Sequence, residues 1–189
     1  PQNPKTPCRI IKMNSSLFKI SRRAFSYNYS NPSNSKVFLQ VSAGETSLGK
    51  MVFELYDSHQ GATTENFKAF VSAENGFVGS KFHRGTSGLG LEGGNLSEDN
   101  SGAFGWKNCD GDLSLQHHKR GMLTTVTDGS NSNGSKFMIT FGEAPFLDGY
   151  QTVFGELVEG DDVLQAVEAQ CSRQGDLKTD ISVTAAGEL

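Results

Sequence analysis

Short segments in which every second residue is apolar, separated by glycine-containing turns, constrain the fold of this 189-residue chain more than any other feature. Two of them cover residues 37–42 and 51–56, with a turn between Gly44 and Gly49. Because successive side chains of a strand point to opposite faces, this period of two predicts a pair of β-strands. The same pattern predicts further strands at residues 121–126, 136–141, 151–155 and 181–185.

Two other segments have the three- and four-residue apolar spacing of an amphipathic helix. The first is predicted to begin at Thr63 or Thr64, where a hydroxyl can cap it, and to end at Asn75 and Gly76. The second is predicted over residues 161–171, with two acidic residues at its start. Short strands at regular spacing with two helices predict a mostly β protein, a closed barrel plugged at its ends, since closure removes exposed strand edges.

The charge is unevenly divided along the chain. Of the 17 basic residues, six lie in residues 1–35, which hold no acid, so residues 36–189 carry 11 basic residues against 21 acidic ones. This division predicts a basic arm over residues 1–35 and a folded, acidic domain over residues 36–189. Because the domain is acidic overall, the groups that neutralise phosphates would have to come from the arm alone, so we expect no nucleic acid partner.

The arm has the composition of an organellar import sequence. It is rich in Lys, Arg, Ser and Asn and free of acid, which is typical of mitochondrial targeting and is shared by chloroplast targeting. We expect a mitochondrial protein, on the matrix side or in the matrix, with a chloroplast location as the alternative. We also expect the arm to be kept and to lie on a partner's surface. An uncleaved presequence, or a tail docked on its own domain, stays open.

Several kinds of site are not expected. Cys8, Cys109 and Cys171 lie far apart and outside any CxxC spacing, which indicates reduced thiols and no zinc site. No run of about 18 apolar residues is present, so no membrane-spanning helix is expected. The basic run at residues 117–120, HHKR, is interpreted as a solvated loop corner. We expect neither a metal nor a cofactor.

The segment 82–95, FHRGTSGLGLEGGN, contains a glycine pattern similar to a phosphate-binding loop. Residues 88–93 fit G-x-G-x-x-G, which binds a pyrophosphate where a helix opens at the third glycine. The residues that follow, LSEDNSG, cannot open such a helix. We therefore interpret the glycines as turns and sites of close strand packing.

Seven sequence blocks in a fixed order carry a family resemblance. They are LGKMVFELY (48–56), TTENFKAF (63–70), KFHRG (81–85), EGGN (92–95), GML (121–123), SNSNGSKFMI (130–139) and FLDGYQTVFGELVEG (146–160). Residues 37–189 thereby resemble the cyclophilins, the family of peptidyl-prolyl cis-trans isomerases. The resemblance implies a closed eight-stranded antiparallel barrel capped by two α-helices, with residues 82–95 forming two of its strands.

The resemblance also implies a site. Rotation about an X-Pro bond is slow because amide resonance sets its barrier, and an arginine that donates a hydrogen bond to the prolyl nitrogen favours the twisted transition state. That arginine corresponds to Arg84. The positions that correspond to the family's proline pocket and its surroundings are Leu89, Gly90, Glu92, Thr127, Asp128, Lys136, Met138, Phe146, Leu147 and Gln151.

Most of these positions differ from the family pattern, and only Arg84 and Leu147 are kept. Glu92 replaces a glutamine that orients the arginine, and it can either hold the guanidinium away from a proline or orient it in the same way. Two functions follow. One is a cyclophilin-like accessory subunit of a large organellar complex, with weak or lost isomerase activity, which binds protein partners through residues 1–35 and its acidic surface. The other is an active isomerase that binds proline-containing segments and assists folding.

Overall fold

The computed structural model describes residues 29–96, 101–104, 110–127, 129 and 131–189. The first 28 residues of the predicted arm lie outside these ranges, as do Cys8, Cys109 and Asp128. Within them, no helix has the length and apolar character needed to cross a membrane. Nor does any group of three or more His, Cys, Asp or Glu side chains in these ranges gather as metal ligands do.

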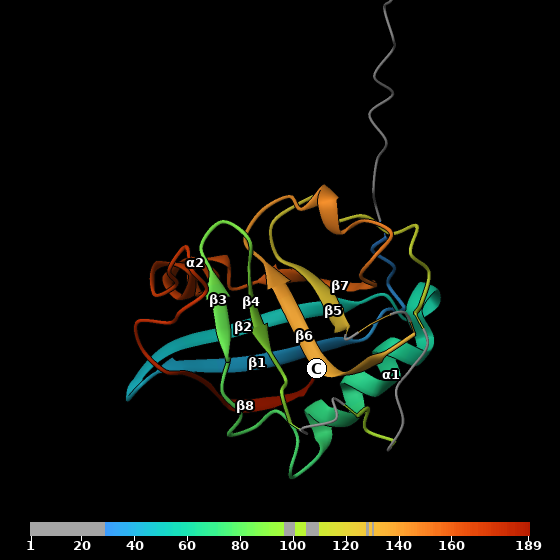
Figure 1. The fold of residues 1–189 in the computed structure, drawn as a ribbon. Coiled ribbons are helices and arrows are strands. Elements are labelled where there is room, and N and C mark those ends of the chain that lie inside the picture. Colours follow the sequence, from blue (N-terminus) through green and yellow to red (C-terminus); the bar gives the residue numbers. More distant parts are fainter. Residues whose placement is uncertain (1–28, 97–100, 105–109, 128, 130) are drawn as a thin grey trace, which may run out of the picture.

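Eight strands form one antiparallel sheet with the order β3-β4-β6-β5-β7-β2-β1-β8 (Figure 1). Their bounds are Lys36–Ala43 (β1), Thr46–Leu55 (β2), Arg84–Thr86 (β3), Gly90–Gly93 (β4), Met122–Thr127 (β5), Asn133–Thr140 (β6), Val153–Glu159 (β7) and Ile181–Glu188 (β8). The strands predicted from alternating residues are confirmed, with ends that shift by a few residues. The first turn is shorter than expected, because β2 already begins at Thr46.

The sheet is a curled half-barrel, so the prediction of a closed barrel is wrong. No ladder pairs β3 with β8 in the described part of the chain. Residues 79–82 and the connection between α2 and β8 lie along these edges instead. The amide of Val183 bonds to the carbonyl of Ser80 at 3.0 Å, and the amide of Gly85 bonds to that of Gly175 at 3.0 Å. Closure fails because β3 has only three residues, and the chain beside it forms irregular contacts.

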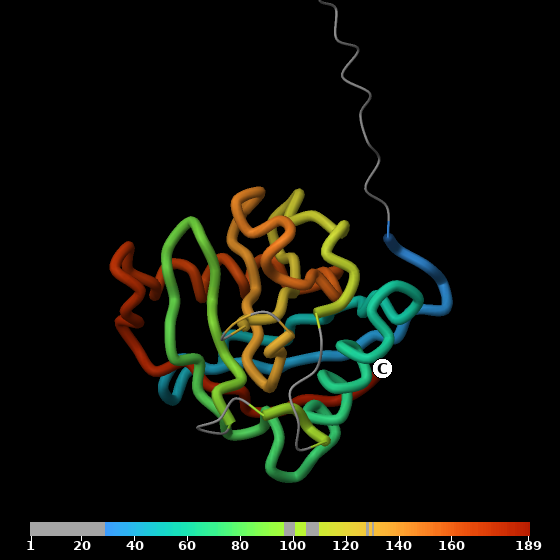
Figure 2. The backbone as a smooth tube through the Cα atoms, turned by 45° about the vertical axis from the view of Figure 1, so that its right-hand side comes forward, coloured from blue at the N-terminus to red at the C-terminus, as the bar shows by residue number. Residues whose placement is uncertain are grey.

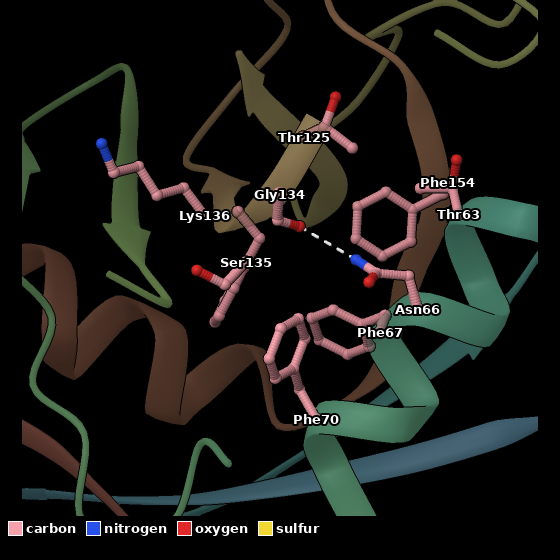
Figure 3. Close-up of a pocket in the computed structure, with 10 residues that line it drawn as sticks. Thr63, Asn66, Phe67, Phe70, Thr125, Gly134, Ser135, Lys136 and Phe154 are labelled. Atoms are coloured by element: carbon pink, nitrogen blue, oxygen red, sulfur yellow. Dashed lines mark hydrogen bonds between the residues drawn. The ribbon is translucent and has the colours of Figure 1, made fainter. Parts of the chain in front are cut away.

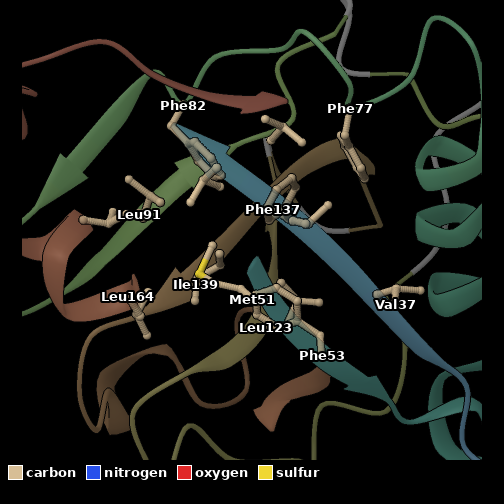
Figure 4. Packing of buried hydrophobic residues seen from close by; sticks show 14 of the residues in the cluster. Val37, Met51, Phe53, Phe77, Phe82, Leu91, Leu123, Phe137, Ile139 and Leu164 are labelled. Atoms are coloured by element: carbon tan, nitrogen blue, oxygen red, sulfur yellow. The ribbon is translucent and has the colours of Figure 1, made fainter. Parts of the chain in front are cut away.

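The core lies inside the curl and is strongly aromatic (Figure 4). Phe67 packs against Phe77, Phe137 and Phe154 with ring centroids 4.9, 5.2 and 5.2 Å away. A second, smaller cluster consists of Tyr56, Leu115, Met122 and Val153, with Tyr29 packed against it. The free thiol of Cys171 is buried, and burial raises its pKa to about 11.

The two helices cover different parts of the sheet, and residues near the C-terminal end lie beside the first one (Figure 2). They are α1 (Asp57–Ser72) and α2 (Asp161–Ala169). The second helix agrees with its prediction to within two residues. A 3-10 helix, η1 (Pro145–Leu147), precedes β7.

The predicted ends of the first helix are wrong, because α1 both begins and ends earlier. Thr63 and Thr64 lie inside it, and the Thr64 hydroxyl donates to the carbonyl of Gly61 at 3.0 Å without capping the helix. The opening turn has no apolar spacing, and Gln60 interrupts it with a non-helical backbone (φ −129°, ψ 36°). The helical pattern in the sequence therefore becomes visible only after this kink.

Candidate functional site

Three of the predicted site residues lie in one row across neighbouring strands. Arg84 on β3 is the direct partner of Glu92 on β4, Glu92 is the partner of Met138 on β6, and Met138 is the partner of Thr124 on β5. Direct cross-strand partners project from the same face of a sheet. Strand pairing therefore brings Arg84, Glu92 and Met138 together on one face.

Glu92 lies between two basic side chains. Its Oε1 is 3.6 Å from Nη1 of Arg84, and its Oε2 is 3.7 Å from Nε2 of His83. Both distances exceed that of a good hydrogen bond. The Arg84 side chain is 55% exposed whereas that of Glu92 is 16% exposed, so water screens the pair and its contribution to stability is at most about 1 kcal/mol. Glu92 therefore interacts only weakly with the guanidinium and does not fix its position.

Met138 forms the buried floor of the candidate site beside the Arg84 and Glu92 side chains. It is 2% exposed, and a methyl group built onto Gly90 would lie 2.9 Å from its sulfur and 2.8 Å from the carbonyl oxygen of Ile139. The glycine therefore makes room for the methionine side chain. The buried surface here is closed by the flexible thioether of Met138. Leu89 lies in the hairpin turn between β3 and β4, where its amide bonds to the carbonyl of Thr86 at 3.0 Å.

The other four predicted residues line a separate surface pocket of about 380 Å³. They are Thr127, Phe146, Leu147 and Gln151, and the pocket is completed by Asp110, Leu113, Gly129, Gly149 and Tyr150. Phe146 is 64% exposed and Tyr150 is 77% exposed, so two aromatic rings stand at its rim. Gln151 Oε1 is buried without a hydrogen-bond partner in the described part of the chain. Such an aromatic rim suits an extended peptide carrying an apolar side chain.

A buried histidine connects the strand row to the pocket wall. Nδ1 of His117 lies 2.7 Å from Oδ1 of Asp148, the residue that follows η1, and Nε2 lies 3.1 Å from the Thr124 hydroxyl. The backbone amide of His117 also donates to Asp148 Oδ1 at 2.8 Å. These bonds fix the position of η1, which carries Phe146 and Leu147.

His117 is 1% exposed, and burial lowers its pKa even though Asp148 acts in the opposite direction. The ring is therefore neutral at pH 7, with the proton on Nδ1 pointing at Asp148. The interpretation of residues 117–120 as a solvated corner is wrong. Lys119 pairs with Glu156, and Arg120 bonds to Asp161 at 2.9 Å and also to Glu168. These partners are distant in sequence, so the basic run itself gives no sign of them.

Two buried amides of α1 hold the loop that borders the pocket. Gln60 donates to the carbonyl of Asp112 at 2.8 Å and accepts from its amide at 3.0 Å. Asn66 donates to the carbonyl of Gly134 at 2.9 Å and accepts from the amide of Ala103 at 2.8 Å. Figure 3 shows Asn66 facing Gly134 across a small recess that Lys136 also lines. Asp110 and Leu113, on the held loop, form part of the pocket.

The structure thus places Arg84, Glu92 and Met138 in a strand row, Leu89 in a hairpin turn, and Thr127, Phe146, Leu147 and Gln151 on a pocket wall. His117, Asp148, Gln60 and Asn66 support the site and were missed. Asn66 and Asp148 could have been found from the sequence, because both are polar residues inside the family blocks TTENFKAF and FLDGYQTVFGELVEG. A model of the cyclophilin type peptidyl-prolyl cis-trans isomerase/CLD family matches residues 38–188.

Proposed function

This chain belongs to the cyclophilin-type peptidyl-prolyl cis-trans isomerase family, and we propose that it acts mainly as an interaction module whose isomerase activity is weak or lost. In this role the domain binds an extended protein segment over the pocket beside η1. The basic segment 1–35 and the acidic surface of the domain provide further contacts to a large organellar assembly, in the mitochondrion.

The observation that carries this proposal is the state of the strand row. A carboxylate, Glu92, lies 3.6 Å from the guanidinium that would have to donate to a prolyl nitrogen. In a catalyst the hydrogen bond from this donor to the prolyl nitrogen has to be stronger in the transition state than in the ground state. A nearby negative charge stabilises the guanidinium where it already is, and so reduces this difference.

The apolar floor supports the same conclusion. Met138 occupies the space above Gly90, and Leu89 is drawn into the hairpin turn. A proline ring placed here has less apolar surface to contact than in a site built from larger side chains. The pocket beside η1 keeps two exposed aromatic rings, Phe146 and Tyr150, which are the kind of side chains that anchor protein interfaces.

Charge and composition support the proposed mitochondrial location. Residues 1–35 hold six basic side chains and no acid, which is typical of mitochondrial targeting. Fusing residues 1–35 to a fluorescent reporter tests this part directly. Transport to mitochondria supports it, and transport to chloroplasts or to neither organelle contradicts it.

A second candidate, an active isomerase that assists folding, is favoured by the exposure of the arginine. At 55% exposed and beyond hydrogen-bond distance from Glu92, Arg84 keeps donors that face solvent. In this alternative Glu92 orients the guanidinium, as a glutamine would. The chain then remains an active isomerase and loses only affinity for its proline-containing substrate.

An isomerisation assay on a proline-containing tetrapeptide distinguishes the two candidates. For an interaction module we expect a small rate above the uncatalysed one, changed by less than about threefold in Arg84→Ala, since threefold is less than 1 kcal/mol. A robust rate that Arg84→Ala abolishes would overturn the proposal and establish the second candidate. Lys81→Ala is the matched control, because this exposed cation lies close in sequence but pairs with Asp180.

A further inference from the structure

Residues 29–35 make an unusually dense set of contacts with the domain, although their sequence, YSNPSNS, reads as a linker. Three donors from this segment reach the carboxylate of Glu54 on β2. They are the Ser30 hydroxyl at 3.1 Å, the Asn31 amide at 3.0 Å and the Asn34 side-chain amide at 2.8 Å. Asn34 also bonds to the carbonyl of Tyr29 at 3.2 Å, which ties the segment to itself.

Glu54 depends on these donors. The residue is 6% exposed, and burial alone would raise the pKa of its carboxyl, but the bonds from Asn34, Asn31 and Ser30 lower it below the ordinary value. A buried carboxylate without partners is strongly unfavourable. All the hydrogen bonds that its carboxylate receives within the described ranges come from residues 30–34, so the segment supplies what this charge needs.

The far end of the segment is held by α1. The amide of Ser35 donates to Asp57 Oδ2 at 2.6 Å, and its carbonyl accepts from the amide of Leu55 at 2.9 Å. Lys68 completes this end by reaching both the Ser35 hydroxyl at 3.2 Å and Asp57 at 3.0 Å. The last residue before β1 is therefore fixed from two elements.

The near end is held by aromatic packing. The ring of Tyr29 lies 5.4 Å from Tyr56, 5.9 Å from His59 and 5.9 Å from His118, in edge-on orientations. Tyr29 thereby covers the small apolar cluster that Tyr56 shares with Leu115, Met122 and Val153. Edge-on aromatic pairs of this kind stabilise a fold beyond the area they bury.

We propose that Tyr29 to Ser35 form a strap that is part of the folded domain, anchored on the buried carboxylate of Glu54. The boundary between the basic segment and the domain then lies at Tyr29 and not after Ser35. Proteolytic processing that removes the basic segment falls upstream of Tyr29, because loss of strap residues would take hydrogen-bond donors and cover away from Glu54 and would uncover the Tyr56 cluster. This proposal is independent of whether the domain is an active isomerase.

Limited digestion of the full chain with chymotrypsin tests the strap. This protease cleaves after aromatic residues, and the chain offers Phe18, Phe25 and Tyr27 upstream as well as Tyr29. We expect products that begin at Ser26 or Asn28 to accumulate, while the bond after Tyr29 stays intact. In Glu54→Gln a neutral amide, with one acceptor oxygen and an NH2 donor, replaces the charged carboxylate, and cleavage after Tyr29 should become at least about tenfold faster, which corresponds to the loss of hydrogen bonds to a charged group.

Two further variants keep the test decisive. Glu45→Gln, at an exposed turn position, is the matched control and should digest like the wild type. If Glu54→Gln is cut throughout the barrel because it unfolds, Asn34→Ala gives the answer, since it removes one donor and leaves two. Equal cleavage after Phe25 and Tyr29 in the wild type, or no acceleration after Tyr29 in a folded variant, would overturn the proposal.

Discussion

Arg84 and Glu92 face each other as direct partners on β3 and β4, with Nη1 3.6 Å from Oε1. The pair brings a negative charge next to the donor on which proline isomerisation would depend. Its exposure limits the strength of the interaction, so a single substitution should be able to undo it. We therefore expect the charge on Glu92 to affect the binding and isomerisation of a proline-containing peptide more than the stability of the fold.

Replacing the carboxylate should strengthen the site. In Glu92→Gln the guanidinium loses its negative neighbour but keeps a neutral side chain of the same size. We expect the catalysed rate or the affinity for a proline-containing peptide to rise about two- to fivefold, which corresponds to about 0.4–1 kcal/mol. Steady-state isomerisation and peptide titration measure this. Glu65→Gln, on the exposed side of α1, should change neither quantity, and an unchanged Glu92→Gln would show that the carboxylate is harmless.

Two glycines should respond in opposite ways to the same substitution. Gly90→Ala places a methyl group 2.8 Å from a backbone oxygen and 2.9 Å from Met138, so the strand has to shift, at a cost of about 1–3 kcal/mol. Gly61→Ala, inside α1, meets no atom within 4 Å and should stabilise the protein by about 0.5–1 kcal/mol. Urea unfolding of both variants checks the contrast. A tolerated Gly90→Ala would show that Met138 can leave the floor.

The buried histidine should make stability depend on pH. The folded state holds His117 neutral with a pKa below the ordinary 6.5, whereas the unfolded chain takes up a proton near 6.5. Stability should therefore be full above pH 7 and fall as the pH drops below 6.5, by up to about 1.4 kcal/mol per unit. Glu54 and Asp57 lose their contributions only below their ordinary values of 4.5 and 3.8, outside this window.

His117→Gln isolates this effect. The variant should lose about 1–3 kcal/mol at pH 8, because the Asp148 and Thr124 contacts are broken. Its stability should then change less than that of the wild type between pH 7 and pH 5, as measured by urea unfolding at each pH. His83→Gln, at a partly exposed histidine, should keep the wild-type slope. A slope that survives in His117→Gln would assign the effect to other groups.

The aromatic rim should matter for binding and not for folding. Phe146 is 64% exposed, so Phe146→Ala should change the free energy of unfolding by less than about 0.5 kcal/mol. Affinity for a bound proline-containing segment should fall about 5- to 30-fold, corresponding to about 1–2 kcal/mol. Isothermal titration measures the affinity. Val158→Ala, which truncates another exposed apolar residue, should leave it unchanged, and equal effects of both variants would argue against a site at this rim.

Local patterns in the sequence predicted the strands well and the ends of the first helix poorly. Alternation of apolar residues depends only on neighbours along the chain, which is why β1 and β2 were found from residues 37–42 and 51–56. The opening turn of α1 has no such pattern, since the side chains of Asp57 and Gln60 bond to Ser35 and Asp112. The sequence also contains no sign of the open seam, the gap between the edge strands β3 and β8, because this gap depends on irregular contacts of residues 79–82 and 172–175.

Family motifs in the sequence indicated the positions of the candidate site but not the residues that support it. Arg84, Glu92 and Met138 were placed by family motifs, and strand register brings them together. Asp148 lies 31 residues from His117, and no local pattern joins the two. Glu54 occupies a polar position in an alternating strand, which predicts exposure, yet residues 30–34 cover it. Pairing between distant polar groups is the part of the structure that composition and periodicity do not encode.

The irregular contacts along the seam have a consequence for how other chains can engage this protein. The amides of Gly85 on β3 and of Ser87 just after it are already bonded to the carbonyls of Gly175 and Ser172, and on β8 the backbone of Val183 is bonded to Gly79 and Ser80. A peptide that extends a sheet needs unpaired backbone groups at its edge. The paired groups at these positions are not open to an added strand. The same arrangement guards the half-barrel against edge-to-edge self-association.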